Sequence, residues 1–422
     1  MEKFLKIKLR NGMRIILVPE KNTDVFTLLL MVGTGSKYET EKEAGISHFL
    51  EHMFFKGTQK RPTLKELAEP LDNVGGIYNA FTSYEFTGFY VKITSKQKNL
   101  ALEWMADIFF NSLFLEKEIE KEKGIIIEEL NMINDDPMKR VQILWPKLLY
   151  QNQSAGRTII GKKETIKSFT REMILEYKNQ QYVAQNLVLG VSGNFDKKEI
   201  LEKIEKYFQK IKSGKKRERP KLIENQKKPE ILLEKRNVDQ CHLILGTRGV
   251  NLFDERKYIQ EVLSTLLGGM MTSRIFQKIR EEMGIAYYVF SESQSDLDSG
   301  YLAVLAGLKI EQAKKGIKEI LKEFKKIKFK IFSKELKKAK ENIKGKFDIF
   351  WENAENRLNF YILQELLENK ILTKEEFFEK IEKVTLGQVK KFAEKFFRPE
   401  NLNLALIHPY FEKEELEEIL KL

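Results

Sequence analysis

The amino-acid sequence predicts an α+β fold of two similar domains, each a mostly antiparallel sheet packed with helices, related by internal duplication. The chain's 422 residues exceed what one ordinary hydrophobic core holds. Short apolar runs typical of strands are interspersed with longer segments of helical periodicity. A helix–strand unit near the end of the first half recurs near the end of the second half.

The repeated unit reads TREMILEYKNQQYVAQNLVL from Thr170 and TLGQVKKFAEKFFRPENLNL from Thr385, 215 residues later. The two segments align without a gap, so that an amphipathic helix leads through a short turn into an apolar strand in both. Internal duplication explains this register better than a chance likeness of two helix–strand units. The matched pairs are Thr170 with Thr385, Tyr177 with Phe392, Tyr182 with Phe397, Asn186 with Asn401 and Leu187 with Leu402.

A charged segment, Lys210–Glu230, divides the chain almost in half. It contains two prolines and little periodicity, which is typical of a linker between domains. We therefore place an N-terminal domain at 1–212, a linker at 213–230 and a C-terminal domain at 231–422.

Strands and helices follow from the period of the apolar residues. The strands are expected at 13–18, 26–33, 88–94, 241–247 and 301–307. Helices are expected at 95–111, 117–133 and 337–369.

The composition argues against a nucleic-acid-binding protein and against a membrane protein. Lysines account for much of the net charge of +12, but they alternate with glutamates along predicted helices, and no arginine-rich tract is present. We therefore expect no nucleic-acid partner. No apolar run approaches the roughly 20 residues of a membrane helix. The N-terminal stretch lacks a secretory core, and Cys241 is the single cysteine, so we expect a cytoplasmic protein with no membrane contact.

Two of the four histidines stand four residues apart in GISHFLEHMFF. On a helix, with Ser47 as the expected N-cap, His48 and His52 share one face and Glu51 projects beside them. Two imidazoles beside a carboxylate suit a catalytic zinc with a general base. Chance would give roughly 0.006 such arrangements in a chain of this composition, so a metal site is the better interpretation.

A catalytic zinc usually takes a third protein ligand from another element. Glu128 and Glu129 stand in an apolar stretch whose residues Ile125–Ile127 and Leu130 we expect to be buried. A carboxylate among buried residues is costly unless it is paired or bound to a metal. Glu122, two turns before Glu129, could hydrogen-bond a ligating histidine; an ordinary surface glutamate is the alternative.

The motif H-x-x-E-H followed after 76 residues by a glutamate resembles the pitrilysin/insulysin family of zinc metallopeptidases, the inverzincins. The chain is most similar to half-length bacterial members, which are related to the mitochondrial processing peptidases. The resemblance implies that His48, His52 and Glu129 bind Zn²⁺. It further implies that Glu51 is the general base and that Glu122 supports the site.

Two further segments carry the resemblance. NAFTSYEFTGFYV, from Asn79, resembles the active-site strand of the family, in which Asn79 and Ala80 would hold the substrate backbone as an added strand. SRIFQKIREEMGIAYYVFSE resembles the arginine–tyrosine motif, so Arg280 and Tyr287 would bind substrate; the adjacent Tyr288 is a rival. The preceding LLGGMMTSR resembles a glycine-containing loop of the family, although a helix-ending turn explains it equally well.

We therefore expect a metallopeptidase that cleaves short or unfolded peptides. Half-length members of the family dimerise, so the resemblance implies a homodimer whose sites combine zinc from one subunit with Arg280 and Tyr287 of the other. A basic chamber would favour acidic peptides. The same ligands also suit manganese or cobalt. A non-catalytic partner subunit of a processing-peptidase-like complex is the alternative function.

Overall fold

The computed structural model describes residues 4–421 and divides into two compact units. Each unit takes segments from both halves of the chain. The described residues of unit 1 fall within Met1–Leu130, Arg157–Pro220 and Ile349–Ile371, and those of unit 2 within Asn131–Gly156, Lys221–Asp348 and Leu372–Leu422.

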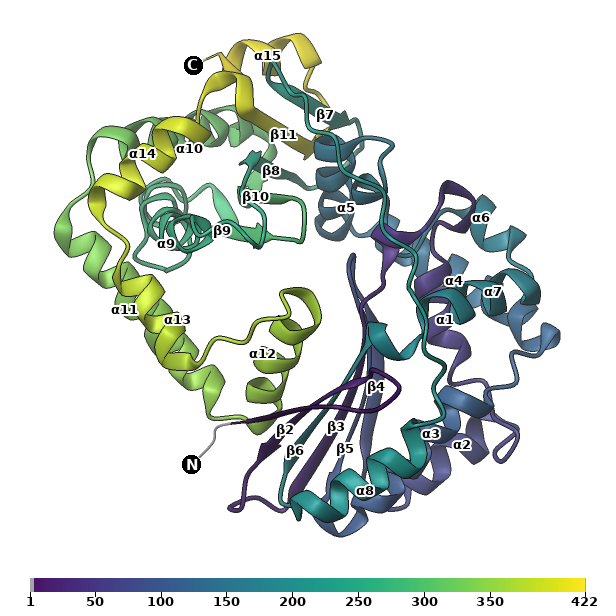
Figure 1. The fold of residues 1–422 in the computed structure, drawn as a ribbon. Helices are drawn as coiled ribbons and strands as arrows, with labels where there is room; N and C mark the ends of the chain where they lie inside the picture. The colour runs from purple at the N-terminus through teal and green to yellow at the C-terminus, as the bar shows by residue number, and fades with distance from the viewer. Residues whose placement is uncertain (1–3, 422) are drawn as a thin grey trace. The chain divides into compact units, whose positions relative to one another are not determined.

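Unit 1 is built on a six-stranded sheet of order β1-β2-β6-β3-β5-β4 (Figure 1). Among the described strands of this sheet, only the β2–β6 pair is parallel, and the other neighbours are antiparallel. The strands are β1 Leu5–Lys8, β2 Arg14–Pro19, β3 Val25–Val32, β4 Ile77–Thr82, β5 Thr87–Thr94 and β6 Leu187–Gly193.

Unit 2 is built on a five-stranded sheet of order β7-β11-β8-β10-β9. The β7–β11 pair is parallel and the remaining neighbours are antiparallel. The strands are β7 Glu230–Glu234, β8 Gln240–Arg248, β9 Ala286–Ser295, β10 Gly300–Lys309 and β11 Leu402–Ile407.

The two sheets share one topology. If β1 is set aside, strands taken in chain order occupy the same five positions in each sheet, and the parallel pair joins the first strand to the last in both. The α+β class and the pair of similar domains predicted from the sequence are therefore confirmed.

The repeated sequence unit has the same structure in each copy. Thr170 and Thr385 are the N-caps of α7 and α14, and each side-chain oxygen accepts a hydrogen bond from the backbone N–H three residues later. Each helix is followed by a short 3₁₀ turn and then by an interior strand of the sheet, β6 or β11.

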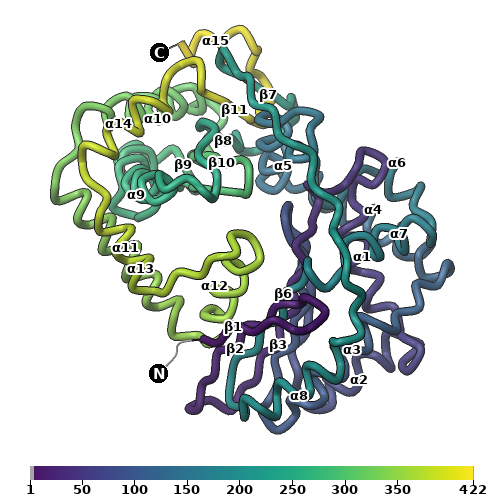
Figure 2. The backbone as a smooth tube through the Cα atoms, in the orientation of Figure 1, coloured from purple at the N-terminus to yellow at the C-terminus, as the bar shows by residue number. Residues whose placement is uncertain are grey.

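Fifteen α-helices are present among residues 4–421, and the segment between α8 and β7 contains neither helix nor strand (Figure 2). No helix within the described residues is both long and apolar enough to cross a bilayer. The helices are α1 Ile46–Met53, α2 Leu64–Asp72, α3 Lys98–Asn111, α4 Glu116–Asp135, α5 Pro137–Tyr150, α6 Lys163–Ser168, α7 Arg171–Gln181, α8 Lys197–Phe208, α9 Lys257–Leu267, α10 Ala313–Phe329, α11 Ser333–Trp351, α12 Ala354–Leu367, α13 Lys374–Glu382, α14 Leu386–Phe396 and α15 Lys413–Leu420.

Each sheet is covered on one face by a helix that the other half of the sequence supplies. In unit 2, α5 packs on β8 and β11, with Val141, Leu144 and Trp145 against Ile244 and Ala405. In unit 1, α12 packs on β2 and β6, with Leu358, Tyr361 and Ile362 against Ile16 and Val188 (Figure 1).

The single helix expected at 337–369 is therefore wrong, because that segment forms two helices. α11 ends at Trp351, and α12 begins after Asn353, whose side chain accepts a hydrogen bond from the Glu355 N–H. The break lets the chain pass from unit 2 to unit 1, so that α12 can bury its apolar face on the first sheet.

Candidate metal centre and active site

Helix α1 carries both histidines of the motif, and a carboxylate from outside the helix holds its N-terminus. Glu39 accepts hydrogen bonds from the Gly45 and Ser47 N–H groups at 2.8 and 2.9 Å. Gly45 is the N-cap, with φ of +98°, a conformation that favours glycine. Ser47 is therefore not the N-cap predicted from the sequence; it lies in the first turn, with its hydroxyl 2.7 Å from that of Tyr177.

Glu39 is completely buried. Burial raises the pKa of its carboxyl group to about 7, although the two backbone hydrogen bonds work in the opposite direction. The helix that carries the metal-site residues thus starts on a fixed, buried anchor.

The structure brings His48, His52 and Glu129 together. One ligand atom of each lies within 4.8 Å of the other two. Glu129, on α4, places its two carboxylate oxygens 3.7 Å from His48 Nε2 and 3.7 Å from His52 Nε2. Ligands of a tetrahedral zinc stand about 3.4 Å apart. The donor set and the spacing both fit zinc, and the neighbouring Glu128 is not part of the cluster.

A buried carboxylate orients His52. Its Nδ1 lies 2.8 Å from Glu122 Oε1, so Nδ1–H donates to Glu122 and the Nε2 lone pair faces Glu129. The second oxygen of Glu122 pairs with Lys56 Nζ at 2.6 Å. Burial alone would raise the pKa of Glu122, but these two partners lower it. Glu122 thus contacts His52 in the way that carboxylates commonly contact metal-binding histidines, and its predicted supporting role stays a prediction.

His48 lies deeper than His52. Burial, with the nearby His52 as a second cause, lowers the pKa of His48 to about 3, so its imidazole is neutral at neutral pH. A neutral imidazole is the form that binds a metal. Its Nδ1 is buried and finds no hydrogen-bond partner among residues 4–421.

Glu51 is positioned by the edge strand of the first sheet. The Thr82 hydroxyl, at the end of β4, donates a hydrogen bond of 2.5 Å to Glu51 Oε2. Burial raises the pKa of the Glu51 carboxyl group, and the Thr82 hydrogen bond and His52 oppose the rise. Asn79 is exposed and Ala80 is buried on the same strand, which ends the sheet beyond β5.

The expected burial of α4 is wrong in part. Ile126 is fully buried, but Ile125 is 52% exposed. The buried face of α4 is a narrow stripe that Ile119, Glu122 and Ile126 form at helical spacing. A run of three isoleucines therefore does not define one buried face, because successive residues point 100° apart.

Arg280 and Tyr287 lie in unit 2. Arg280 is on a π-helical turn, η6 Phe276–Glu282, and its guanidinium carbon lies 5.1 Å from the Phe276 ring centroid. Tyr287 is the second residue of β9 and is 76% exposed, whereas the Tyr288 hydroxyl lies 2.9 Å from His242 Nδ1. The roles predicted for Arg280 and Tyr287 stay predictions.

Three residues that support the site were not found from the sequence: Glu39, Lys56 and Thr82. Lys56 follows His52 by only four residues, and this short separation was an available signal, although Lys56 lies beyond the end of α1 at Met53. Glu39 and Thr82 carry no such signal, because they reach α1 from a turn and from a strand.

Family models match most of the chain. A model described as insulinase (peptidase family M16) matches residues 14–163. A second, described as the peptidase M16 inactive domain, matches residues 168–343.

Relatives extend the likeness over nearly the full length. An uncharacterized zinc protease of Bacillus subtilis, YmxG, is 37% identical over 95% of this chain and 97% of its own. An uncharacterized zinc protease of Rickettsia felis is 35% identical over 82% of this chain and 83% of its own.

Solved structures share the fold. A protease from Helicobacter pylori gives a TM-score of 0.90 at 23% identity, over 96% of this chain and 99% of that one. A chain of complex III2 from Candida albicans gives a TM-score of 0.85 at 18% identity, over 99% of both. With its two family models and its relatives named as zinc proteases, the chain belongs to the insulinase family of zinc peptidases, peptidase family M16.

Proposed function

We propose that this protein is a zinc-dependent endopeptidase or oligopeptidase that hydrolyses short or unfolded peptides in the cytoplasm. The observation that carries the proposal is the cluster of His48, His52 and Glu129 with Glu51 on the same helix as the histidines. Zinc held there would acidify a water molecule and polarise the scissile carbonyl group.

Glu51 is the proposed general base. It takes a proton from the attacking water as the new C–O bond forms, and it gives that proton to the amide nitrogen as the C–N bond breaks. Burial raises the pKa of Glu51 towards the pH at which its carboxyl group must accept the proton and then donate it. The Thr82 hydrogen bond holds the carboxylate in one orientation during the exchange.

Substrate binding is proposed at the edge of the first sheet. β4 stands at the end of the strand order, so a peptide can add beside Asn79 and Ala80 through main-chain hydrogen bonds. Arg280 and Tyr287 are proposed to bind the substrate and to stabilise the oxyanion. The exposed Tyr287 suits this role better than Tyr288, whose hydroxyl is engaged by His242.

A homodimer with shared sites is the proposed assembly. Each site would combine the zinc cluster of one subunit with Arg280 and Tyr287 of the other. Mixing Glu51→Gln with Arg280→Ala subunits should then restore part of the activity, because one site of a mixed dimer keeps all its groups. A mixture as inactive as each variant alone would contradict shared sites.

Zinc content and peptide cleavage, measured on the same sample, test the proposed activity. We expect bound zinc, cleavage of an internally quenched peptide, loss of cleavage with a chelator and recovery on adding zinc. Protein that retains zinc but cleaves no peptide would contradict the proposal. That result would favour a non-catalytic partner subunit, a function suggested by the inactive-domain match and the complex III2 neighbour.

A further inference from the structure

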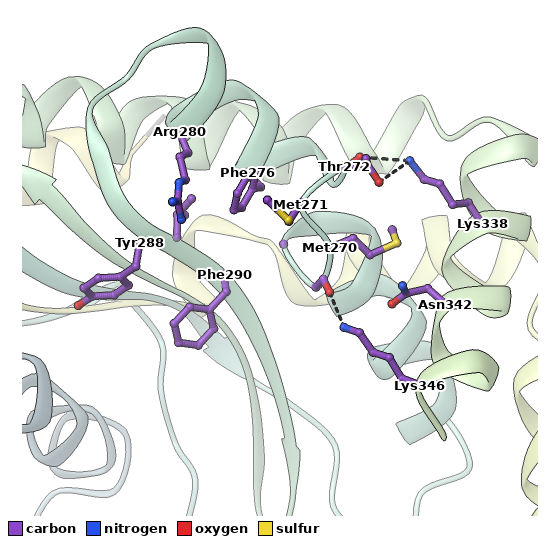
Figure 3. A pocket seen from close by; sticks show the side chains of 13 residues that line it. Met270, Met271, Thr272, Phe276, Arg280, Tyr288, Phe290, Lys338, Asn342 and Lys346 are labelled. Carbon is purple, nitrogen blue, oxygen red and sulfur yellow. Dashed lines mark hydrogen bonds between the residues drawn. The ribbon is translucent and has the colours of Figure 1, made fainter. Parts of the chain in front are cut away.

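Unit 2 contains an open pocket of about 620 Å³ that the zinc cluster does not use. Figure 3 shows Arg280, Tyr288 and Phe290 on one side and Lys338, Asn342 and Lys346 of α11 on the other. The volume lies within the range of ligand-binding pockets in proteins. All of its lining residues belong to unit 2.

The glycine loop between α9 and η6 forms the middle of this pocket. A Cβ atom at Gly268 would stand 2.5 Å from the Ser291 backbone nitrogen, so only glycine lets the loop lie against β9. Of the two glycines in LLGGMMTSR, Gly268 is therefore explained by close packing on the edge strand, and Gly269 by close packing on Thr265 of α9. The loop then presents Met270 and Met271 to the pocket.

Two lysines of α11 reach this loop from one helix face. Lys338 donates to the carbonyl and hydroxyl oxygens of Thr272 at 3.1 Å, and Lys346 donates to the Gly269 carbonyl at 2.9 Å. Lys338, Asn342 and Lys346 are spaced by four residues, which places them in a row along the pocket. These neutral oxygen atoms orient the two ammonium groups and supply no opposite charge of their own.

The charge of the pocket is strongly positive. Arg280, Lys338 and Lys346 line it, and none of the lining side chains among the described residues is a carboxylate. Glu261 interacts electrostatically with Lys346 but is directed to Ser293, and burial raises the pKa of its carboxyl group. Glu335, which pairs with Arg274, also interacts electrostatically with Lys338. Both acids lie outside the lining, which contains three cations and, among the described residues, no carboxylate.

The walls between the cations are apolar. Phe276, Val289 and Phe290 line the pocket beside the two methionines. β9 stands at the end of the second sheet and has the position that β4 has in the first. An edge strand with apolar side pockets suits an extended peptide better than a small, fully hydrated anion.

We infer that this pocket is a subsite for carboxylate groups of a peptide, bound by Lys338 and Lys346 of α11 together with Arg280. The inference rests on the proposed function in taking the ligand to be a peptide. It assigns a preference for acidic peptides to a defined set of side chains. A carboxylate can come from Asp or Glu side chains or from the peptide C-terminus, and both supply the same hydrogen-bond acceptors.

Binding to full-length Glu51→Gln protein tests the subsite without hydrolysis. Four forms of one short labelled peptide are compared by fluorescence anisotropy: with glutamates or with glutamines, each as a C-terminal acid or amide. We expect the most acidic form to bind most tightly, with the preference weakening as salt is added. Equal affinities of all four forms would overturn the inference.

The double variant Lys338→Gln/Lys346→Gln tests the two lysines. Its affinity for the preferred peptide should fall about tenfold for each lysine–carboxylate contact that is lost. The matched control is Lys334→Gln/Lys337→Gln, because both residues are exposed on α11 and neither lines the pocket. Lys338→Arg/Lys346→Arg should keep the preference. A preference unchanged in the double glutamine variant would refute the assignment.

The peptide arms identify the source of the carboxylate. If exchanging glutamate for glutamine lowers the affinity, the subsite binds side-chain carboxylates. If amidation of the C-terminus lowers the affinity, the subsite binds the C-terminal carboxylate. Either result supports the carboxylate subsite. A protein that shows the lysine-dependent preference but whose wild-type form cleaves nothing would refute the proposed activity and leave the subsite standing.

Discussion

Replacing Glu122 with glutamine is expected to weaken zinc binding at a site that Glu122 does not touch directly. The Glu122 carboxylate is 2% exposed and accepts from His52 Nδ1 at 2.8 Å while pairing with Lys56 at 2.6 Å. The amide has no charge and one acceptor oxygen, so it cannot satisfy both partners. His52 then loses the anion that fixes its tautomer and raises its basicity.

Loss of such a support typically costs 10- to 100-fold in metal affinity, or about 1.4 to 2.7 kcal/mol. We expect the upper part of this range because water does not screen the buried carboxylate. The zinc dissociation constant is measured by competition with a chromophoric chelator, and thermal unfolding of the zinc-free protein checks the fold.

Glu120→Gln is the control, because Glu120 is an exposed residue of the same helix that pairs with Lys123. It should leave the zinc dissociation constant unchanged. A Glu122→Gln constant within about twofold of wild type, a difference near 0.4 kcal/mol, would refute the role given to Glu122.

Three other perturbations follow from the site and the repeat. Thr82→Val should lower kcat about tenfold at unchanged zinc content, because Glu51 loses its orienting hydrogen bond, while Thr82→Ser should retain most activity. Glu39 has a pKa raised from 4.5 to about 7 in the folded protein, so the folded state binds the extra proton between these values. The contribution of Glu39 to the free energy of unfolding should therefore fall by about 3 kcal/mol as the pH rises from 4.5 to 7. Urea titrations of wild type and Glu39→Gln should show this fall as a change with pH in the difference between their free energies of unfolding. A difference that does not change with pH would contradict the prediction. Thr170→Ala and Thr385→Ala should each lower the free energy of unfolding by about 1 kcal/mol, because both threonines cap equivalent helices, and a large effect at one site with none at the other would argue against equivalence.

Local sequence patterns predicted much of this structure. The alignment of Thr170 with Thr385 identified the repeat because each copy needs the same N-cap, helix and interior strand. The spacing of His48 and His52 predicted that the two side chains lie together, because helix geometry alone brings residues four apart onto one face. Selecting Glu129 over Glu128 required the resemblance to a known family, since both glutamates fit the local pattern.

The features that were missed depend on contacts between segments distant in sequence. α5 and α12 have ordinary amphipathic patterns, and nothing in such a pattern says which sheet the helix covers. The continuous helical period of 337–369 hid the break at Asn353 because both helices have the same period. Glu39 reaches the α1 N-terminus from a turn, so local capping rules favoured Ser47 instead.

The most direct test of the central claim compares peptide hydrolysis by wild-type and Glu51→Gln protein at equal, measured zinc content. Glutamine keeps the size of the side chain and can still accept the Thr82 hydrogen bond, but it cannot accept the proton of the attacking water. We predict that kcat/KM falls by about 10²- to 10⁴-fold while zinc stays bound. A Glu51→Gln enzyme that retained wild-type kcat/KM with its zinc in place would contradict the account.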